Sequence, residues 1–289
     1  MTMTLPERTR PASPSWPVRL LRGARNEPAM ATGLALIGAL VVVAAVPGLF
    51  AAQSPFAINS AATLQPPSAA HWFGTDDVGR DLFARVVHGA RVTLSICAGS
   101  LLLSAILGGF FGLISGYFGG LIDQVLGRLV DVMLSFPPII LGIIITGILG
   151  PQMVNLVLAL SIVYMPVFFR IARAGAMSEA SLPYVEAARS VGLRDTTILG
   201  RHVARNVMPL MLTQYMILFP LILQIQAALG FLGLGVQPPT PDWGAILEQG
   251  KDYILFAPWI SIFPGLAVLI TSLALMLVGR ALQRRMNSR

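Results

Sequence analysis

Long apolar stretches alternate with polar, arginine-containing segments along the chain. The hydrocarbon core of a bilayer is about 30 Å thick, so a helix that crosses it needs roughly 20 mostly apolar residues. The stretches of this kind are Met30–Ala51, Val92–Phe118, Val132–Gly150, Val154–Phe169, Val207–Leu234 and Trp259–Val278. Pro137 and Pro138 lie near the start of the third stretch and predict a kink or a late helix start there. The pattern predicts an all-α, polytopic membrane protein with about six transmembrane helices.

The polar segments divide the chain into five regions, and six crossings place both termini on the same side of the membrane. The regions are an N-terminal tail (1–29), the first transmembrane helix (30–51), a long loop (52–91), a core of five transmembrane helices (92–281) that includes a polar loop at about 171–206, and a C-terminal tail (282–289).

The distribution of basic residues predicts which side this is. Sixteen of the twenty Lys and Arg residues fall in the N-terminal tail, in the short loop at Arg128, in the polar loop counted from Arg170, and at the C-terminal end counted from Arg280. The other four are Arg80, Arg85, Arg91 and Lys251. Because cytoplasmic loops carry the excess of Lys and Arg, both termini and the 171–206 loop are expected to be cytoplasmic. The loops Gln53–Arg91 and Gly235–Pro258 are then extracytoplasmic.

The composition agrees with a membrane protein. Hydrophobic residues make up 55% of the chain and charged residues 11%, against about 25% charged in soluble domains. The net charge of +7 could suggest nucleic acid, but the arginines are scattered between apolar stretches instead of forming one basic face. We therefore expect a lipid bilayer as the partner and no nucleic acid. Cys97 is the one cysteine, which excludes a disulfide framework.

The sequence offers no catalytic, cofactor-binding or metal-binding residues. It contains no G-x-x-x-x-G-K-[ST] phosphate loop, so we expect the chain not to bind ATP. His71 and His88 fall on the opposite side of the membrane from His202, which excludes a three-histidine metal site. A secondary transporter is an alternative, but such proteins usually carry ionisable residues within their spans. The six stretches have none at mid-membrane depth.

A short helix is predicted in the cytoplasmic loop. Ser181 can cap its start, Pro183 is tolerated in its first turn, and Gly192 can end it in a left-handed conformation. Asp195 can cap a second helix that leads to the fifth span. On the short helix an apolar stripe is expected from Tyr184, Ala187, Ala188 and Val191, with Glu186 and Arg189 at its rim. The pattern alone leaves two interpretations open, docking of a partner protein and binding to lipid headgroups.

A row of glycines occurs in the second span. Gly108, Gly112, Gly116 and Gly120 recur every four residues, a spacing that lets a second helix approach closely. We expect the row to pack within the subunit or against a partner pore subunit, and a substrate role is the alternative.

Three motifs resemble one transporter family. Glu186-Ala187-Ala188, followed after three residues by Gly192, resembles the cytoplasmic EAA loop of the permease subunits of ATP-binding cassette (ABC) importers. The second half of that motif departs, because His202–Arg205 stands where the family has I-x-L-P. The segments 71–91 and 231–244 resemble the dipeptide, oligopeptide and nickel permeases, in particular the "C"-type pore subunit.

The resemblance implies a function and a set of partners. It implies the permease fold of type I ABC importers, in the bacterial inner membrane, with a second homologous permease, two cytoplasmic ATP-binding subunits and an extracytoplasmic substrate-binding protein. ATP and Mg²⁺ would be bound by the partner subunits, and the cargo would be di- or oligopeptides, with nickel chelates or glutathione as alternatives. The coupling helix that docks on the ATPase would comprise Tyr184, Glu186, Ala187, Ala188, Arg189 and Gly192.

Five charged residues crowd together before the second span, namely Asp76, Asp77, Arg80, Asp81 and Arg85. Asp77 can cap a helix that begins near Gly79, and Asp81 stands four residues before Arg85. One interpretation is a local network of caps and ion pairs. The other is a contact to the extracytoplasmic binding protein or to substrate at the pore mouth.

Overall fold

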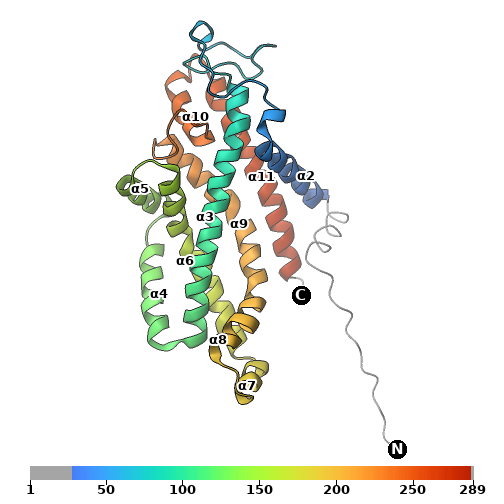
Figure 1. Ribbon diagram of the computed structural model, residues 1–289, viewed down its shortest axis with the longest axis vertical. Helices are drawn as coiled ribbons and strands as arrows, with labels where there is room; N and C mark the ends of the chain where they lie inside the picture. The colour runs from blue at the N-terminus through green and yellow to red at the C-terminus, as the bar shows by residue number, and fades with distance from the viewer. Residues whose placement is uncertain (1–27, 288–289) are drawn as a thin grey trace, which may run out of the picture.

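The computed structural model describes residues 28–287, which form helices and connecting loops without a β-sheet in that range (Figure 1). The helices are α2 (Pro28–Ala45), α3 (Leu82–Phe118), α4 (Gly120–Leu134), α5 (Pro138–Leu149), α6 (Met153–Ala180), α7 (Pro183–Ser190), α8 (Asp195–Ile198), α9 (Ala204–Phe231), α10 (Trp243–Gly250) and α11 (Trp259–Asn287). Most of the predicted N-terminal tail, and the last two residues of the C-terminal tail, lie outside the described residues.

The expected all-α membrane architecture is confirmed. Within residues 28–287, five helical stretches are long and apolar enough to cross a membrane, and they belong to α2, α3, α6, α8–α9 and α11. The pair α4 and α5 raises the number to six if it is counted as one span. About six spans, as the hydrophobic pattern predicts, are therefore present.

The third predicted span, Val132–Gly150, is wrong as a single helix. The chain breaks at Ser135–Pro137, and α4 and α5 meet at an angle of 95°. The late helix start is confirmed, because α5 begins at Pro138. With 12 residues α5 is only about 18 Å long at about 1.5 Å per residue, too short to cross the bilayer alone. The chain before the break is also helical, although Asp123, Arg128 and Asp131 interrupt its apolar pattern.

The longest helix, α3, begins ten residues before the predicted second span, at Leu82. Its 37 residues correspond to about 55 Å at about 1.5 Å per residue. Asp81 caps its start by accepting a hydrogen bond from the backbone of Ala84. One uninterrupted helix therefore joins the charged segment of residues 76–81 to the opposite end of the molecule.

The glycine row packs within the subunit, against α6. A Cβ atom at Gly108, Gly112 or Gly116 would collide with the backbone carbonyl oxygens of Met165, Phe169 and Arg173, respectively. The two backbones lie in direct contact along this face, as the spacing predicts. Gly120 does not belong to this contact, because it starts α4 at a φ of 59° with no atom within 4 Å of its Cβ position.

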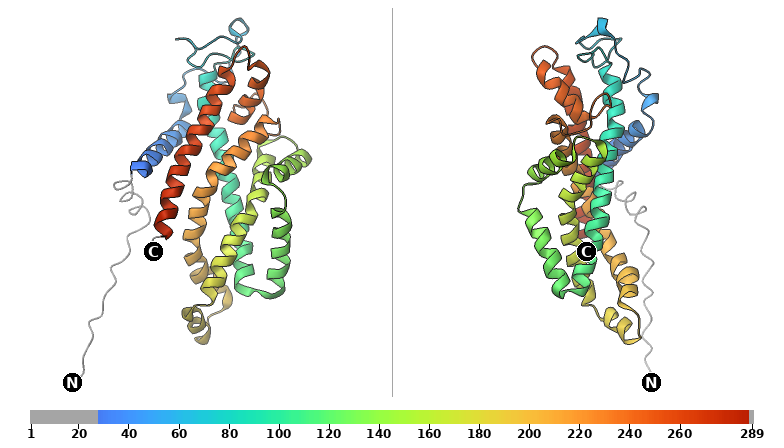
Figure 2. Two further views of the ribbon diagram at one scale, coloured as in Figure 1. Left: turned by 180° about the vertical axis from the view of Figure 1, so that it is seen from behind. Right: turned by 60° about the vertical axis from the view of Figure 1, so that its left-hand side comes forward.

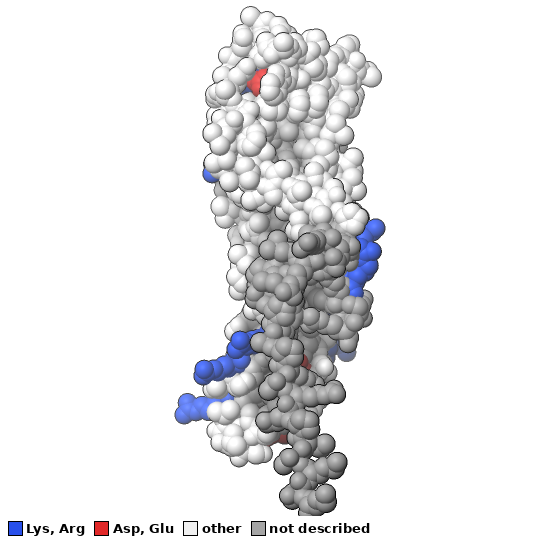
Figure 3. Space-filling model, turned by 90° about the vertical axis from the view of Figure 1, so that its right-hand side faces the viewer, with Lys and Arg blue, Asp and Glu red and all other residues white. Residues whose placement is uncertain are grey.

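The two long loops and the short helix α7 lie at opposite ends of the molecule. The segment between α2 and α3 and helix α10 lie together at one end, and α7 and α8 form the other end (Figure 1). The views in Figure 2 show the same separation. On the face drawn in Figure 3, most of the visible Lys and Arg side chains lie away from the α10 end. The segments predicted to lie on opposite sides of a membrane are thus at opposite ends of the molecule.

Candidate functional site

Helix α7 is a separate short helix with defined ends. Pro183 occupies its first turn and Leu182 is its N-cap residue, while Gly192 follows the helix with a φ of +84°. The left-handed glycine is as predicted. The predicted cap at Ser181 is wrong: α6 continues to Ala180, and the Ser181 hydroxyl donates to the carbonyl oxygen of Ser178 instead.

The predicted apolar stripe of α7 is divided between two faces. Tyr184 and Ala188 are half-buried and pack on the core beside Val185, which is fully buried. Ala187 and Val191 point the other way, and Val191 is 78% exposed. The face that remains free for a partner therefore consists of Pro183, Glu186, Ala187, Ser190 and Val191.

A polar cluster anchors the start of α7, and we call it the Glu179 cluster (Glu179, Tyr184 and Asn206). The Tyr184 hydroxyl donates to a Glu179 carboxylate oxygen at 2.6 Å, and the Asn206 amide donates to the same oxygen at 2.8 Å. Burial and the bond to Glu179 raise the pKa of Tyr184 to about 12, so the hydroxyl stays protonated and able to donate. The cluster joins α7 to α6 and α9.

A second cluster anchors the end of α7, and we call it the Tyr117 cluster (Tyr117, Arg189 and Asp195). The Asp195 carboxylate accepts a hydrogen bond from the Tyr117 hydroxyl at 2.5 Å and one from Arg189 Nε at 3.1 Å. The Arg189 guanidinium also lies 5.3 Å from the centre of the Tyr117 ring, within the range of a cation–π contact. The predicted N-cap at Asp195 is wrong. Arg194 is the N-cap residue of α8, and the Asp195 side chain binds in this cluster instead.

The segment that departs from the EAA motif is helical. Leu199–Val203 form a π-helical turn between α8 and α9, so His202 and Arg205 lie on a nearly continuous helix that leads into the span. A pocket of about 290 Å³ opens beside α7 at this turn. Its lining residues are Tyr184, Arg201, His202, Arg205 and Asn206.

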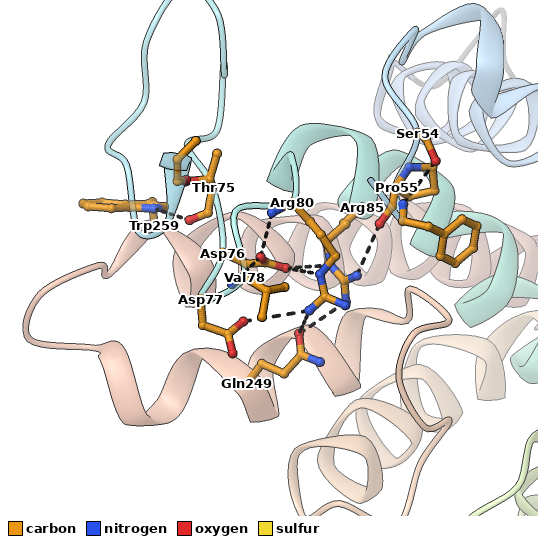
Figure 4. Close-up of polar contacts among 12 residues, drawn as sticks. Ser54, Pro55, Thr75, Asp76, Asp77, Val78, Arg80, Arg85, Gln249 and Trp259 are labelled. Carbon is orange, nitrogen blue, oxygen red and sulfur yellow. Dashed lines mark hydrogen bonds and ion pairs between the residues drawn. The ribbon is translucent and has the colours of Figure 1, made fainter. Parts of the chain in front are cut away.

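At the other end of the molecule, four residues form what we call the outer network (Asp76, Arg80, Arg85 and Gln249; Figure 4). Arg80 Nε donates to an Asp76 carboxylate oxygen at 2.6 Å, and Arg85 Nε lies 3.4 Å from the same oxygen. Both guanidinium groups also reach the side-chain oxygen of Gln249 on α10, at 3.4 and 3.2 Å. Arg85 is completely buried and Asp76 is 1% exposed.

The predicted caps and pairs of this segment are partly wrong. The helix begins at Leu82 and is capped by Asp81, so Asp77 is not its cap. One carboxylate oxygen of Asp81 accepts the capping hydrogen bond, and the other lies 2.9 Å from His71 Nδ1. Arg85 pairs with Asp76 instead of Asp81. The arrangement supports the interpretation as a local network. Of the five charged residues only Asp77, at 31%, keeps an appreciable exposed fraction.

Asp242, which no motif in the sequence singles out, is completely buried before α10. One carboxylate oxygen accepts hydrogen bonds from the Thr93 hydroxyl at 2.6 Å and the Gln226 amide at 2.8 Å. The other accepts from the backbone of Ala245 at 3.1 Å, which caps α10. Burial raises the pKa of Asp242, while these hydrogen bonds act in the opposite direction. Its position before Trp243, at a helix start after prolines, is a signal that could have found it.

Among the described residues, no group of three His, Cys, Asp or Glu side chains is placed to hold a metal ion. The features that remain for function are the exposed face of α7 with its two anchoring clusters, and the outer network with Asp242 at the α10 end.

Comparison with known proteins shows what the chain is similar to. A family model described as "binding-protein-dependent transport system inner membrane component" matches residues 108–288. The dipeptide transport system permease of Alkalihalophilus pseudofirmus is 36% identical, over 87% of this chain and 83% of its own length. The probable D,D-dipeptide permease of Escherichia coli K12 is 35% identical, over 88% and 86%. A glutathione transport permease of Pectobacterium atrosepticum is 37% identical, over 75% and 72%.

Proposed function

Because this chain belongs to the inner-membrane components of binding-protein-dependent transport systems, we propose that it forms half of a peptide-conducting pore and that α7 is its coupling helix. The chain is a permease subunit of an ABC importer, a membrane component without an ATPase site of its own. The cargo, the partner subunits and the roles of individual residues are the parts that we propose.

One observation carries the coupling role of α7. The helix projects at the end of the molecule opposite α10, its exposed face carries Glu186 and Ala187, and a polar cluster holds each of its ends. A helix that is both exposed and held at both ends suits docking, because a force on its outer face reaches the spans instead of bending a loop. The residues assigned to docking are Glu186 and Ala187 for contact, Tyr184, Ala188 and Arg189 for anchoring, and Gly192 for the helix end.

The partners follow from this assignment. A second homologous permease completes the pore, two cytoplasmic subunits bind ATP and Mg²⁺, and an extracytoplasmic binding protein delivers the cargo at the α10 end. Both termini then lie in the cytoplasm, in keeping with the arginine distribution. ATP binding closes the ATPase subunits around the coupling helices, which switches the pore from inward-facing to outward-facing.

Short peptides are the proposed cargo. Relatives named for dipeptide transport and one named for glutathione, itself a tripeptide, share about the same identity with this chain. These cargoes share peptide backbone groups. A pore that recognises few side-chain features would admit all of them, so selection among them would rest with the binding protein. A competition assay with dipeptides, longer peptides, glutathione and nickel chelates would rank these classes.

Reconstitution into vesicles tests the proposal. The permease is combined with its pore partner, ATPase subunits and binding protein, and ATP-driven uptake of a labelled dipeptide is measured. Replacing Glu186 and Gly192 together should abolish uptake while membrane insertion stays normal. Gln124→Ala, exposed on α4 and outside both assigned surfaces, is the matched control and should transport normally. Normal uptake by the double variant would show that α7 is not the coupling helix.

A further inference from the structure

We propose that the Tyr117 cluster transmits the displacement of α7 to α3, and that α3 carries it as a rigid rod to the outer network. This inference rests on the proposed docking role of α7 and adds the route by which docking reaches the far end of the molecule. It assigns Tyr117 and Asp195 as positioning residues, which act through α3 and touch neither ATP nor cargo.

The first step is the joint between α7 and α3. Tyr117 lies at the end of α3, 78 positions before Asp195 in the sequence, yet the two side chains are joined at 2.5 Å. Tyr117 itself is only 7% exposed, so its ring is held in the core while its hydroxyl reaches outward. The Glu179 cluster, in contrast, joins α7 to α6 and α9. The Tyr117 cluster joins α3 to Asp195 at the start of α8 and, through Arg189, to α7, although α3 is next to neither helix in the sequence.

The second step is the stiffness of α3. A proline within a helix removes a backbone hydrogen bond and favours a kink. Pro166 lies inside α6, Pro209 and Pro220 inside α9, and Pro264 inside α11. Helix α3 contains no proline along its 37 residues. Among these four long helices, α3 is the one that can pass a displacement from end to end without a proline kink.

The third step is the coupling of α3 to α6 along the glycine row. Because the backbones touch at Gly108, Gly112 and Gly116, one helix cannot slide without displacing the other. Near the Tyr117 cluster, Asp123 of α4 accepts a hydrogen bond from Ser115 of α3 at 2.5 Å and pairs with Arg173 of α6. Helices α3, α4 and α6 are thus joined at the end where α7 acts.

The last step is the connection of α3 to the α10 end. Arg85, one turn into α3, is held by Asp76 and Gln249. The Trp243 indole of α10 donates to the carbonyl oxygen of Val86 at 2.9 Å. A shift of α3 therefore moves α10 and the segment around Asp76 together, which are the surfaces where a binding protein would be received.

The test separates ATPase docking from the response at the far end. In a Cys97→Ala background, Trp72→Cys places a fluorescent label on an exposed side chain near the outer network. Tyr117→Phe removes the hydroxyl but keeps the ring, and the complex is measured for ATPase assembly, ATP hydrolysis, uptake and the ATP-dependent change of the label. Assembly and hydrolysis should persist. The label response and the uptake per ATP should fall about five-fold, the factor that one hydrogen bond typically carries.

Matched variants complete the test. Tyr215→Phe also deletes a hydroxyl that donates to α3, at the carbonyl oxygen of Ala98, but it has no link to α7 and should leave the label response intact. Asp195→Asn should reproduce Tyr117→Phe, and the double variant should be no worse than either single one. A full label response in Tyr117→Phe, or loss of ATPase assembly, would overturn the inference. Absence of ATP-driven uptake by the unsubstituted complex would instead overturn the proposed function, and the inference with it.

Discussion

The Thr93 hydroxyl lies 2.6 Å from the Asp242 carboxylate, although 149 positions separate the two residues. Thr93 belongs to α3 and Asp242 precedes α10, while Gln226 of α9 reaches the same carboxylate oxygen. One buried side chain therefore joins three helices at the α10 end. Asp242 thereby stabilises the α10 end, the surface at which we propose that the binding protein docks.

Asp242→Ala should destabilise the α10 end. It leaves the Thr93, Gln226 and Ala245 donors without their acceptor, and a lost buried hydrogen bond costs about 1–3 kcal/mol. Asp242→Asn should be milder, because its amide keeps an acceptor oxygen and can also donate to the buried Gln226 oxygen, which has no partner in the described structure. Thermal unfolding in detergent compares the two variants. Equal loss in both would argue against this account.

The stability of the protein should depend on pH through the same residue. Burial raises the pKa of Asp242 in the folded state, so folding favours the protonated carboxyl over the ionised form. This contribution is complete below the unfolded pKa of about 3.9 and is lost as the pH rises through the raised folded value. The unfolding temperature of the unsubstituted protein should therefore decrease as the pH rises through this range. In Asp242→Asn this decrease should be absent. An unchanged pH profile would assign the dependence to another group.

Arg85→Met should be strongly destabilising. Removing the guanidinium leaves Asp76 with one buried partner fewer, and breaking a buried pair costs about 3–5 kcal/mol. Adding Asp76→Asn should recover part of the loss, which a double-mutant cycle measures. The exposed pair of Lys251 and Glu248 is the control, and Lys251→Ala should leave the unfolding temperature unchanged. No recovery in the double variant would mean that the two charges are not coupled.

Gly112→Ala should separate α3 from α6. The new methyl group would collide with the Phe169 carbonyl oxygen, and backbone cannot move aside as a flexible side chain can. Gly127→Ala on α4 meets nothing within 4 Å and should stabilise by about 0.5–1 kcal/mol through helix propensity. Opposite shifts of the unfolding temperature are therefore expected. A loss at Gly127 equal to that at Gly112 would indicate a general sensitivity of the helices to alanine.

The sequence predicts this fold where a single chemical rule dominates. Apolar stretches predict most of the spans, the glycine row predicts the contact with α6, and Gly192 predicts the left-handed end of α7. These signals are local, so no tertiary contact has to be known. The apolar pattern does not predict α4, because charged residues interrupt its helical periodicity. In the folded protein, Asp123 and Asp131 form ion pairs with arginines of α6.

The polar sites are harder to predict, because the choice of partner depends on distance in space. Asp81 and Asp77 look equally suited to cap a helix, and only the start at Leu82 decides between them. Arg85 could pair with Asp81 at i,i+4, but Asp76 and Gln249 approach it from outside its own helix. On α7, the burial of Val185 rotates the helix so that the predicted stripe faces two ways. Each of these outcomes is set by a contact between distant segments.

The length of α3 has a further consequence. A rod of about 55 Å in a hydrocarbon layer of about 30 Å would have to tilt by about 57° or more from the membrane normal to be submerged, beyond the usual range of tilt. Part of it must therefore stand clear of the lipid tails. Its charged first turns, with Arg85, mark the α10 end as that part. A soluble protein that approaches the membrane there would meet a raised rim of folded protein before it meets any phospholipid.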